Sequence, residues 1–154
     1  MDAIAMLKAD HDQLKELLAQ LESTTERGVK TREELFARIK GDLTVHETIE
    51  EEIFYPALKE HPKAKDIVLE GYEEHHVVDL VMAELEGLDV ADETWGAKAI
   101  VMKENVEHHI EEEEGEMFKQ ARQVFERDEL EALGERMAVR REEAQRELGV
   151  PARG

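Results

Sequence analysis

Apolar residues recur at alternating three- and four-residue intervals along most of the chain, the spacing of helices that bury one face. This pattern predicts five helical segments. They cover roughly residues 3–27, residue 31 to the prolines at 56 and 62, residues 63–88, residue 94 to beyond 117, and residues 128–148. Strand-like runs of β-branched and aromatic residues are missing. The pattern therefore predicts an all-α protein.

The ends of these segments carry helix signals. Asp2 is a good N-cap for the first segment, and Gly28 is placed to end it. Thr31 and Glu34 have the spacing of a capping box, and Thr94 is a further expected N-cap. Four antiparallel segments joined by short loops indicate an up-down-up-down four-helix bundle over residues 1–126.

The fifth segment is highly charged and offers few apolar residues for packing. We expect residues 127–154 to form an accessory helix on the outside of the same domain. Its expected anchors are Leu130, Leu133, Met137 and Leu148.

Polar residues occupy core positions in each of the first four segments. In the first, His11 fills the gap in the stripe formed by Ile4, Leu7, Leu14, Leu18 and Leu21. In the third, Glu74 and His75 straddle the stripe while His76 points outward, so His75 is preferred over His76. The complete set of expected inward residues is His11, His46, Glu50, His75, His109 and Glu113.

The two halves of the chain repeat each other. The segment from His46 through Glu50 to Tyr55 is echoed 63 residues later by His109, Glu113 and Phe118. His11 precedes His46 by 35 residues, and His75 precedes His109 by 34. The chain thus reads as two helical hairpins with matching histidines.

Buried carboxylates need a counter-charge, since an unpaired ionised group in a core costs several kcal/mol. Neither lysine nor arginine interrupts these core positions, so a bound cation is the better candidate. Residues four apart lie above one another on a helix, which lets His46 with Glu50, and His109 with Glu113, face one site. Six convergent ligands favour two ions over one.

Composition narrows the chemistry. Cysteine is absent, which excludes disulfides, thiolate metal sites and a cysteine nucleophile, and leaves imidazole and carboxylate as metal ligands. The formal charge is −19, from 39 acidic and 20 basic residues, so phosphate backbones are repelled and nucleic acid is not expected as a partner. The start of the chain has neither a signal-peptide pattern nor a long apolar run, so we expect a cytoplasmic protein without a membrane partner.

These motifs resemble the signature of hemerythrin-like (HHE) cation-binding proteins of the bacterial single-domain type, over roughly residues 5 to 120. The residues that carry the resemblance are His11, His46-x-x-x-Glu50, Glu74-His75 and His109-x-x-x-Glu113. The resemblance implies two iron ions joined by carboxylates and an oxo or hydroxo bridge. Manganese is the second choice of metal.

The sequence departs from the oxygen-carrying members of that family on the third helix. Those members have two histidines four residues apart there, whereas the residue four before His75 is Gly71. Tyr72 lies beside this position and Tyr55 ends the His46 motif. After the six inward residues, these two phenols are the next candidates to bind the metal, to hydrogen-bond at the centre or to donate an electron to it. Oxygen carriers also place the last carboxylate five residues after its histidine, at Glu114; Glu113 is preferred because it repeats the spacing of Glu50.

Two functions follow from this resemblance. The first is a non-heme di-iron protein that reacts with peroxide, nitric oxide or dioxygen, in a catalase-like, peroxidase-like or detoxifying role. The alternative is reversible dioxygen binding, or iron or oxygen sensing, without turnover. The expected partner is a small molecule, and the expected oligomeric state is a monomer or a weak homodimer.

Overall fold

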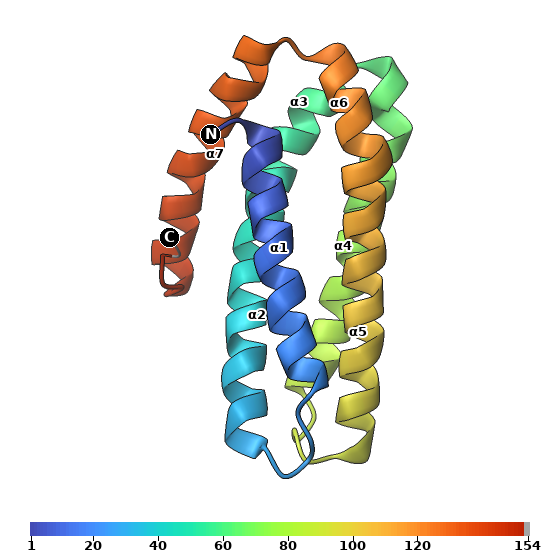
Figure 1. Ribbon diagram of the computed structural model, residues 1–154, viewed down its shortest axis with the longest axis vertical. Helices are drawn as coiled ribbons and strands as arrows, with labels where there is room; N and C mark the ends of the chain where they lie inside the picture. The colour runs from blue at the N-terminus through green and yellow to red at the C-terminus, as the bar shows by residue number, and fades with distance from the viewer. Residues whose placement is uncertain (153–154) are drawn as a thin grey trace.

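Four long helices lie side by side in the computed structural model, which describes residues 1–152. They are α1 (Ala3–Glu22), α2 (Val29–Ile49), α4 (Lys65–Glu86) and α5 (Glu93–Glu112). They run alternately down and up the bundle (Figure 1). Residues 1–152 contain no strand. The predicted all-α, up-down-up-down four-helix bundle is confirmed, with an additional C-terminal helix.

Two of the long helices continue through a π-helical turn. After α2, the turn η1 (Glu50–Phe54) leads into α3 (Tyr55–Lys59), and after α5, η3 (Glu113–Met117) leads into α6 (Phe118–Val124). Pro56 therefore lies within a continuing helix rather than ending it. Since η3 has no proline, a proline is not required for such a turn. Each π turn instead begins at the glutamate of a His-x-x-x-Glu motif, and π turns inside helices are often found at functional sites.

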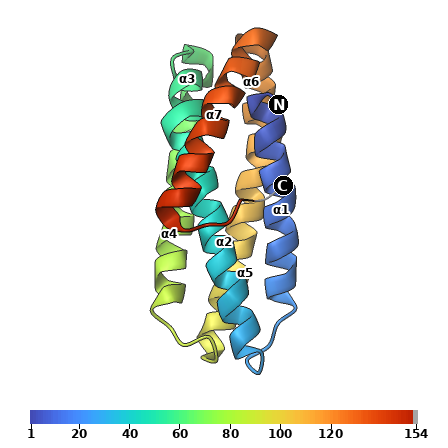
Figure 2. The same cartoon turned by 90° about the vertical axis from the view of Figure 1, so that its left-hand side faces the viewer.

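The C-terminal helix α7 (Arg127–Leu148) packs lengthwise against α1 and α2 (Figures 1 and 2). Its anchors Leu130, Leu133 and Met137 are buried as predicted. The expectation for Leu148 is wrong, because that side chain is 50% exposed and Ala144, one turn earlier, is buried in its place. Residues 153 and 154 of the expected accessory segment lie outside the described residues.

Helix ends differ from the sequence predictions at three places. Helix α1 ends at Glu22, where the hydroxyls of Ser23 and Thr24 donate hydrogen bonds to backbone carbonyls of the last turn. Gly28 precedes the first residue of α2, so it begins that helix rather than ending α1, and the expected capping box at Thr31 is not used. Helix α5 starts after Asp92, whose carboxylate accepts from the backbone N–H of Thr94.

A short 3-10 turn, η2 (Pro62–Ala64), connects α3 to α4. The apolar core then falls into two parts along the bundle axis. One part, toward α3 and α6, includes Leu7, Phe54 and Phe118, and the other, toward the loops before α2 and α5, includes Leu14 and Trp95. His11 lies between Leu7 and Leu14 on α1 and so marks a polar layer between the two parts.

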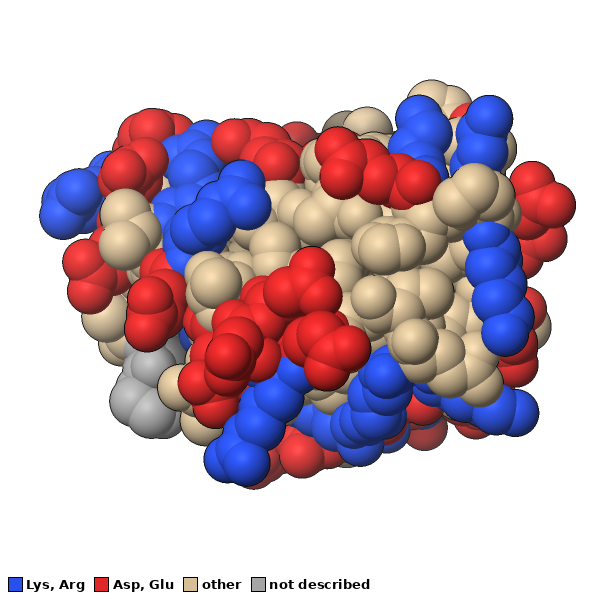
Figure 3. All heavy atoms as spheres, turned by 90° about the horizontal axis from the view of Figure 1, so that it is seen from above, with Lys and Arg blue, Asp and Glu red and all other residues tan. Residues whose placement is uncertain are grey.

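Acidic and basic side chains both surround the end of the bundle that carries α3, α6 and the start of α7, where they frame an uncharged area (Figure 3). Among residues 1–152, none of the helices is long and apolar enough to span a membrane.

Candidate metal centre

All six inward residues predicted from the sequence meet in this polar layer. None is more than 6% exposed, and two of them, His11 and Glu50, are fully buried. Helices α1, α2, α4 and α5 each contribute one histidine, and the two glutamates begin the π turns η1 and η3. The complete set is His11, His46, Glu50, His75, His109 and Glu113.

The two carboxylates lie between the four imidazoles. Glu113 places one oxygen 3.0 Å from Nε2 of His11 and the other 3.1 Å from Nε2 of His109. Glu50 places its Oε1 3.1 Å from the Nε2 atoms of both His46 and His75. Every histidine thus presents Nε2 to the centre, and each carboxylate contacts one histidine from each hairpin.

These contacts define two adjoining groups of ligand atoms. One consists of His11, His46, Glu50 and Glu113, and the other of His75, His109 and the same two glutamates. Within each group the ligand atoms lie within 4.8 Å of one another. Imidazole and carboxylate donors without thiolate suit first-row metal cations.

A second set of carboxylates holds the outer nitrogens of the histidines. The Nδ1 atoms lie 2.6–2.8 Å from carboxylate oxygens in the pairs His11–Glu114, His46–Asp10, His75–Glu51 and His109–Glu74. An ionised carboxylate only accepts, so each Nδ1–H donates and the ring is fixed with Nε2 directed inward. This arrangement is typical of metal-binding histidines.

Sequence reasoning gave no role to Asp10 and Glu51, and it considered Glu114 only as an alternative inner ligand. Glu114 instead accepts from the outer nitrogen of His11, and Glu113 occupies the inner position. A sequence signal for the outer set does exist. An acidic residue directly precedes both His11 and His75, and these two acidic residues are 64 positions apart. Another directly follows both Glu50 and Glu113, and these two are 63 positions apart.

The centre has an approximate two-fold relation between the hairpins. The rings of His11 and His46 lie 5.0 Å apart at 64°, and those of His75 and His109 lie 4.8 Å apart at 65°. His76, the alternative to His75, is exposed. The histidine pairs that the sequence repeat suggested are therefore matched in space.

Tyr55 also reaches the centre. Its hydroxyl donates to Oε2 of Glu113 at 2.6 Å and lies 3.4 Å from Nε2 of both His75 and His109. A Cβ added to Gly71 would lie only 2.9 Å from that hydroxyl, so the absence of a side chain at Gly71 leaves room for the phenol. The space beside Gly71, the sequence position at which oxygen carriers have another histidine, is thus filled by Tyr55.

Tyr72 does not reach the six residues. Its hydroxyl donates to the backbone carbonyl of Glu51 at 3.3 Å, and its ring packs against Tyr55 at 5.1 Å. Of the two phenols proposed from the sequence, only Tyr55 contacts the cluster.

The carboxylates of the cluster shift the pKa values of three of its histidines upward. Burial by itself lowers the pKa of His46 and His109, yet the adjacent charges of Glu50 and Glu113 raise both pKa values well above the ordinary one. For His75, hydrogen bonds to carboxylates outweigh burial and raise the pKa to about 9. Burial and the charge of Glu113 raise the pKa of the Tyr55 phenol well above its usual range. Positive charge is thus strongly favoured at this point in the core.

Two buried atoms in the cluster make no hydrogen bond. They are Oε2 of Glu50 and Nε2 of His46, the latter lying 3.1 Å from Glu50 without hydrogen-bond geometry. Unsatisfied buried polar atoms are rare and call for a ligand or an ion. The donor set and these two atoms fit metal cations.

A helical bundle whose interior carries four histidines and two glutamates belongs to the class of cation-binding four-helix bundles. The sequence profile of the Hemerythrin HHE cation binding domain matches residues 2–121, so the chain belongs to this family. The resemblance inferred from the motifs is confirmed.

The chain is also similar to the crystal structure of a Hemerythrin HHE cation binding domain-containing protein from Mycobacterium kansasii. The TM-score is 0.83 and the sequence identity is 27%, over 96% of this chain and 89% of that one. None of the curated proteins shows a significant match to the chain.

Proposed function

We propose that the chain is a non-heme di-iron protein in which His11, His46, Glu50, His75, His109 and Glu113 hold two ions. The observation that carries this proposal is the division of the cluster into two adjoining ligand groups that share both glutamates. Imidazole and carboxylate without thiolate suit iron, with manganese as the second choice.

We propose further that the loaded protein reacts with a small oxidant, and that hydrogen peroxide is the first substrate to test. When bound, the iron pair supplies a redox centre that exchanges electrons with such molecules. The phenol of Tyr55 adds a proton donor 2.6 Å from Glu113 and only 3.4 Å from two of the histidines. The reaction expected is disproportionation of two peroxide molecules to dioxygen and two water molecules.

Reversible binding of dioxygen, or sensing without turnover, is the alternative function. The space beside the four histidines favours it, because its volume is only about 10 Å³ and it is lined by those histidines, Glu47 and apolar side chains such as Leu43 and Val106. A small space that leaves little room for water protects a bound gas from further reaction.

The experiment that tests the proposal is iron loading of the purified chain. We expect about two irons per chain, near-ultraviolet absorption of a bridged ferric pair, and dioxygen release on addition of peroxide. His109→Ala is expected to lose the absorption, whereas His108→Ala, a substitution of the 65%-exposed neighbour, is expected to keep it. Absence of iron from wild type after anaerobic ferrous loading would refute the proposal; two irons without peroxide turnover would favour the alternative.

A further inference from the structure

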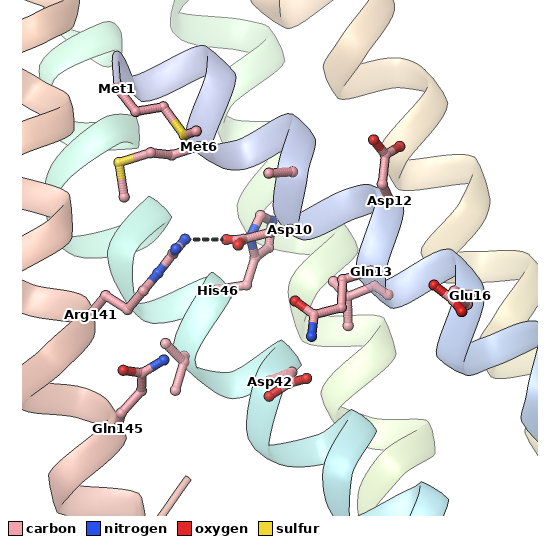
Figure 4. Close-up of a pocket in the computed structure, with 13 residues that line it drawn as sticks. Met1, Met6, Asp10, Asp12, Gln13, Glu16, Asp42, His46, Arg141 and Gln145 are labelled. Carbon is pink, nitrogen blue, oxygen red and sulfur yellow. Dashed lines mark hydrogen bonds and ion pairs between the residues drawn. The ribbon is translucent and has the colours of Figure 1, made fainter. Parts of the chain in front are cut away.

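The C-terminal helix contacts the outer carboxylate of one histidine. Nη2 of Arg141 on α7 donates to Oδ2 of Asp10 at 2.6 Å, and the same oxygen accepts from Nδ1 of His46 at 2.8 Å. Figure 4 shows the Arg141 side chain extending from α7 across to Asp10 on α1, with the His46 ring directly behind it. Three helices are therefore linked in a line that ends at a residue of the candidate metal centre.

This link breaks the two-fold relation between the hairpins. Asp10 and Glu74 are equivalent, because each directly precedes an inward histidine and each accepts from the histidine of the following helix. Asp10 is paired with an arginine. Glu74 faces His108 and Glu112, and among residues 1–152 it has no ion pair with lysine or arginine. The outer carboxylates Glu51 and Glu114 likewise have none in that range.

The position of Arg141 is fixed by the packing of α7. A Cβ on Gly134 would lie 2.3 Å from the carbonyl oxygen of Met1, so only glycine allows this close approach of α7 to the start of α1. Arg140 contacts both carboxylate oxygens of Glu52, at 3.0 and 3.2 Å. The close approach at Gly134 holds α7 against the bundle independently of Arg141, whereas the Arg140 pair, whose partner Glu52 is 54% exposed, adds little.

Arg141 also lies beside a hollow of about 580 Å³ between α1, α2 and α7. His46 and Asp10 form part of its wall, with Gln13, Asp42 and Gln145 around them (Figure 4). Without the arginine, the Asp10 carboxylate would have room and water on this side, and so could rotate away from His46.

We propose that Arg141 is a positioning residue for the metal centre, acting through Asp10 to hold the His46 imidazole with Nε2 directed inward. The proposal rests on the proposed function, since His46 must be a ligand. On this proposal, α7 supports the metal centre and is more than an accessory helix on the outside. The ion held by His11 and His46 is then the one whose binding depends on α7.

The test compares Arg141→Met with Arg140→Met. Both variants remove an ion pair between α7 and the bundle, but only Arg141 contacts a carboxylate that is hydrogen-bonded to an inward histidine. Each protein is loaded anaerobically with ferrous iron, and loss of iron to an excess of chelator is timed. Loss of an outer partner typically weakens metal binding about 10- to 100-fold, so we expect Arg141→Met to release about one iron per chain roughly tenfold faster than wild type, with Arg140→Met close to wild type.

Two further measurements separate positioning from folding. Thermal unfolding of the metal-free variants reports the docking of α7, and we expect similar melting temperatures for Arg141→Met and Arg140→Met. In an Asp10→Asn background, Arg141→Met is expected to add little to the release rate, because the residue through which it acts is already changed.

Equal iron release from the two arginine variants would overturn the proposal, as would an undiminished Arg141 effect in the Asp10→Asn background. In either case wild type would still bind iron and the proposed function would stand. If wild type bound no iron, both would fall.

Discussion

Tyr55 and Phe118 occupy equivalent places in the two halves of the bundle and differ by one hydroxyl. They are 63 residues apart, and each follows the π turn of a His-x-x-x-Glu motif. The ring of Tyr55 stacks on His75 at 5.3 Å, and that of Phe118 stacks on His11 at 6.0 Å. The phenol is therefore, together with the Arg141 contact on the other side, a chemical difference between two closely matched ligand groups.

Tyr55→Phe tests whether this difference matters. The substitution removes the hydrogen bond to Glu113 and leaves the ring in place, so the fold is expected to survive. We expect the ferric absorption to shift and peroxide turnover to fall roughly 10²–10⁴-fold, the range for loss of a positioned proton donor. Tyr72→Phe is the matched control, because its hydroxyl donates to the backbone carbonyl of Glu51 rather than to one of the six inward residues. Unchanged spectrum and turnover in Tyr55→Phe would exclude a role for the phenol.

Gly71→Ala should disturb the same residue from the opposite side. The new methyl group would lie 2.9–3.1 Å from the hydroxyl and ring of Tyr55, which is fully buried and held by its hydrogen bond to Glu113. Overpacking of this kind costs about 1–3 kcal/mol and outweighs the roughly 1 kcal/mol gained by replacing a helical glycine. We expect a lower free energy of unfolding in urea. Gly115→Ala, which meets nothing within 4 Å, should not destabilise the protein.

The bundle could be predicted from the sequence because its signals are local. The three-four spacing of apolar residues, interrupted once per helix by histidine, located both the four helices and the six inward residues. Helix ends were less well predicted, since they depend on single hydrogen bonds such as that between Asp92 and the backbone of Thr94.

The remainder of the centre depends on contacts between distant segments. Arg141 meets Asp10 across 131 residues, and nothing in the local pattern of α7 distinguishes it from its neighbour Arg140. Similarly, Gly71 leaves space for Tyr55 only because α4 packs against α3. The π turns were not predicted either, because sequence spacing alone does not separate them from an ordinary helix.

Stability of the metal-free protein should fall as pH rises from neutral toward 9. The pKa of His75 is raised to about 9 from 6.5, chiefly by carboxylate hydrogen bonds that outweigh burial, so its stabilising charge is fully present below pH 6.5 and is lost through pH 9. Burial, followed by the Asp79 carboxylate, raises the pKa of Glu47 to about 9 from 4.5. The unfolded chain therefore loses this proton first, which also lowers stability across the same range.

Urea unfolding of chelator-treated protein at pH 6.5, 7.5, 8.5 and 9.5 measures this trend. Glu47→Gln cannot ionise, so we expect its stability to fall less steeply than that of wild type. A free energy of unfolding that increased toward pH 9 would contradict the raised pKa values of His75 and Glu47.

Metal binding should stabilise the fold, because the six inward residues come together only when all four long helices are packed. Manganous ion is a useful probe, since it does not react with air as ferrous iron does. At a free concentration one hundred times its dissociation constant, an ion that binds only the folded state adds about 2.7 kcal/mol. For a domain of this size that corresponds to a rise in melting temperature of roughly 5–10 °C. His75→Ala should reduce the rise, whereas His76→Ala, a substitution of the exposed neighbour, should keep it in full. Because metal displaces protons from the four imidazoles, the rise should also be larger at pH 8 than at pH 6. An equal rise in wild type and His75→Ala would mean that manganese binds elsewhere, for instance at the surface group of Glu74, His108 and Glu112.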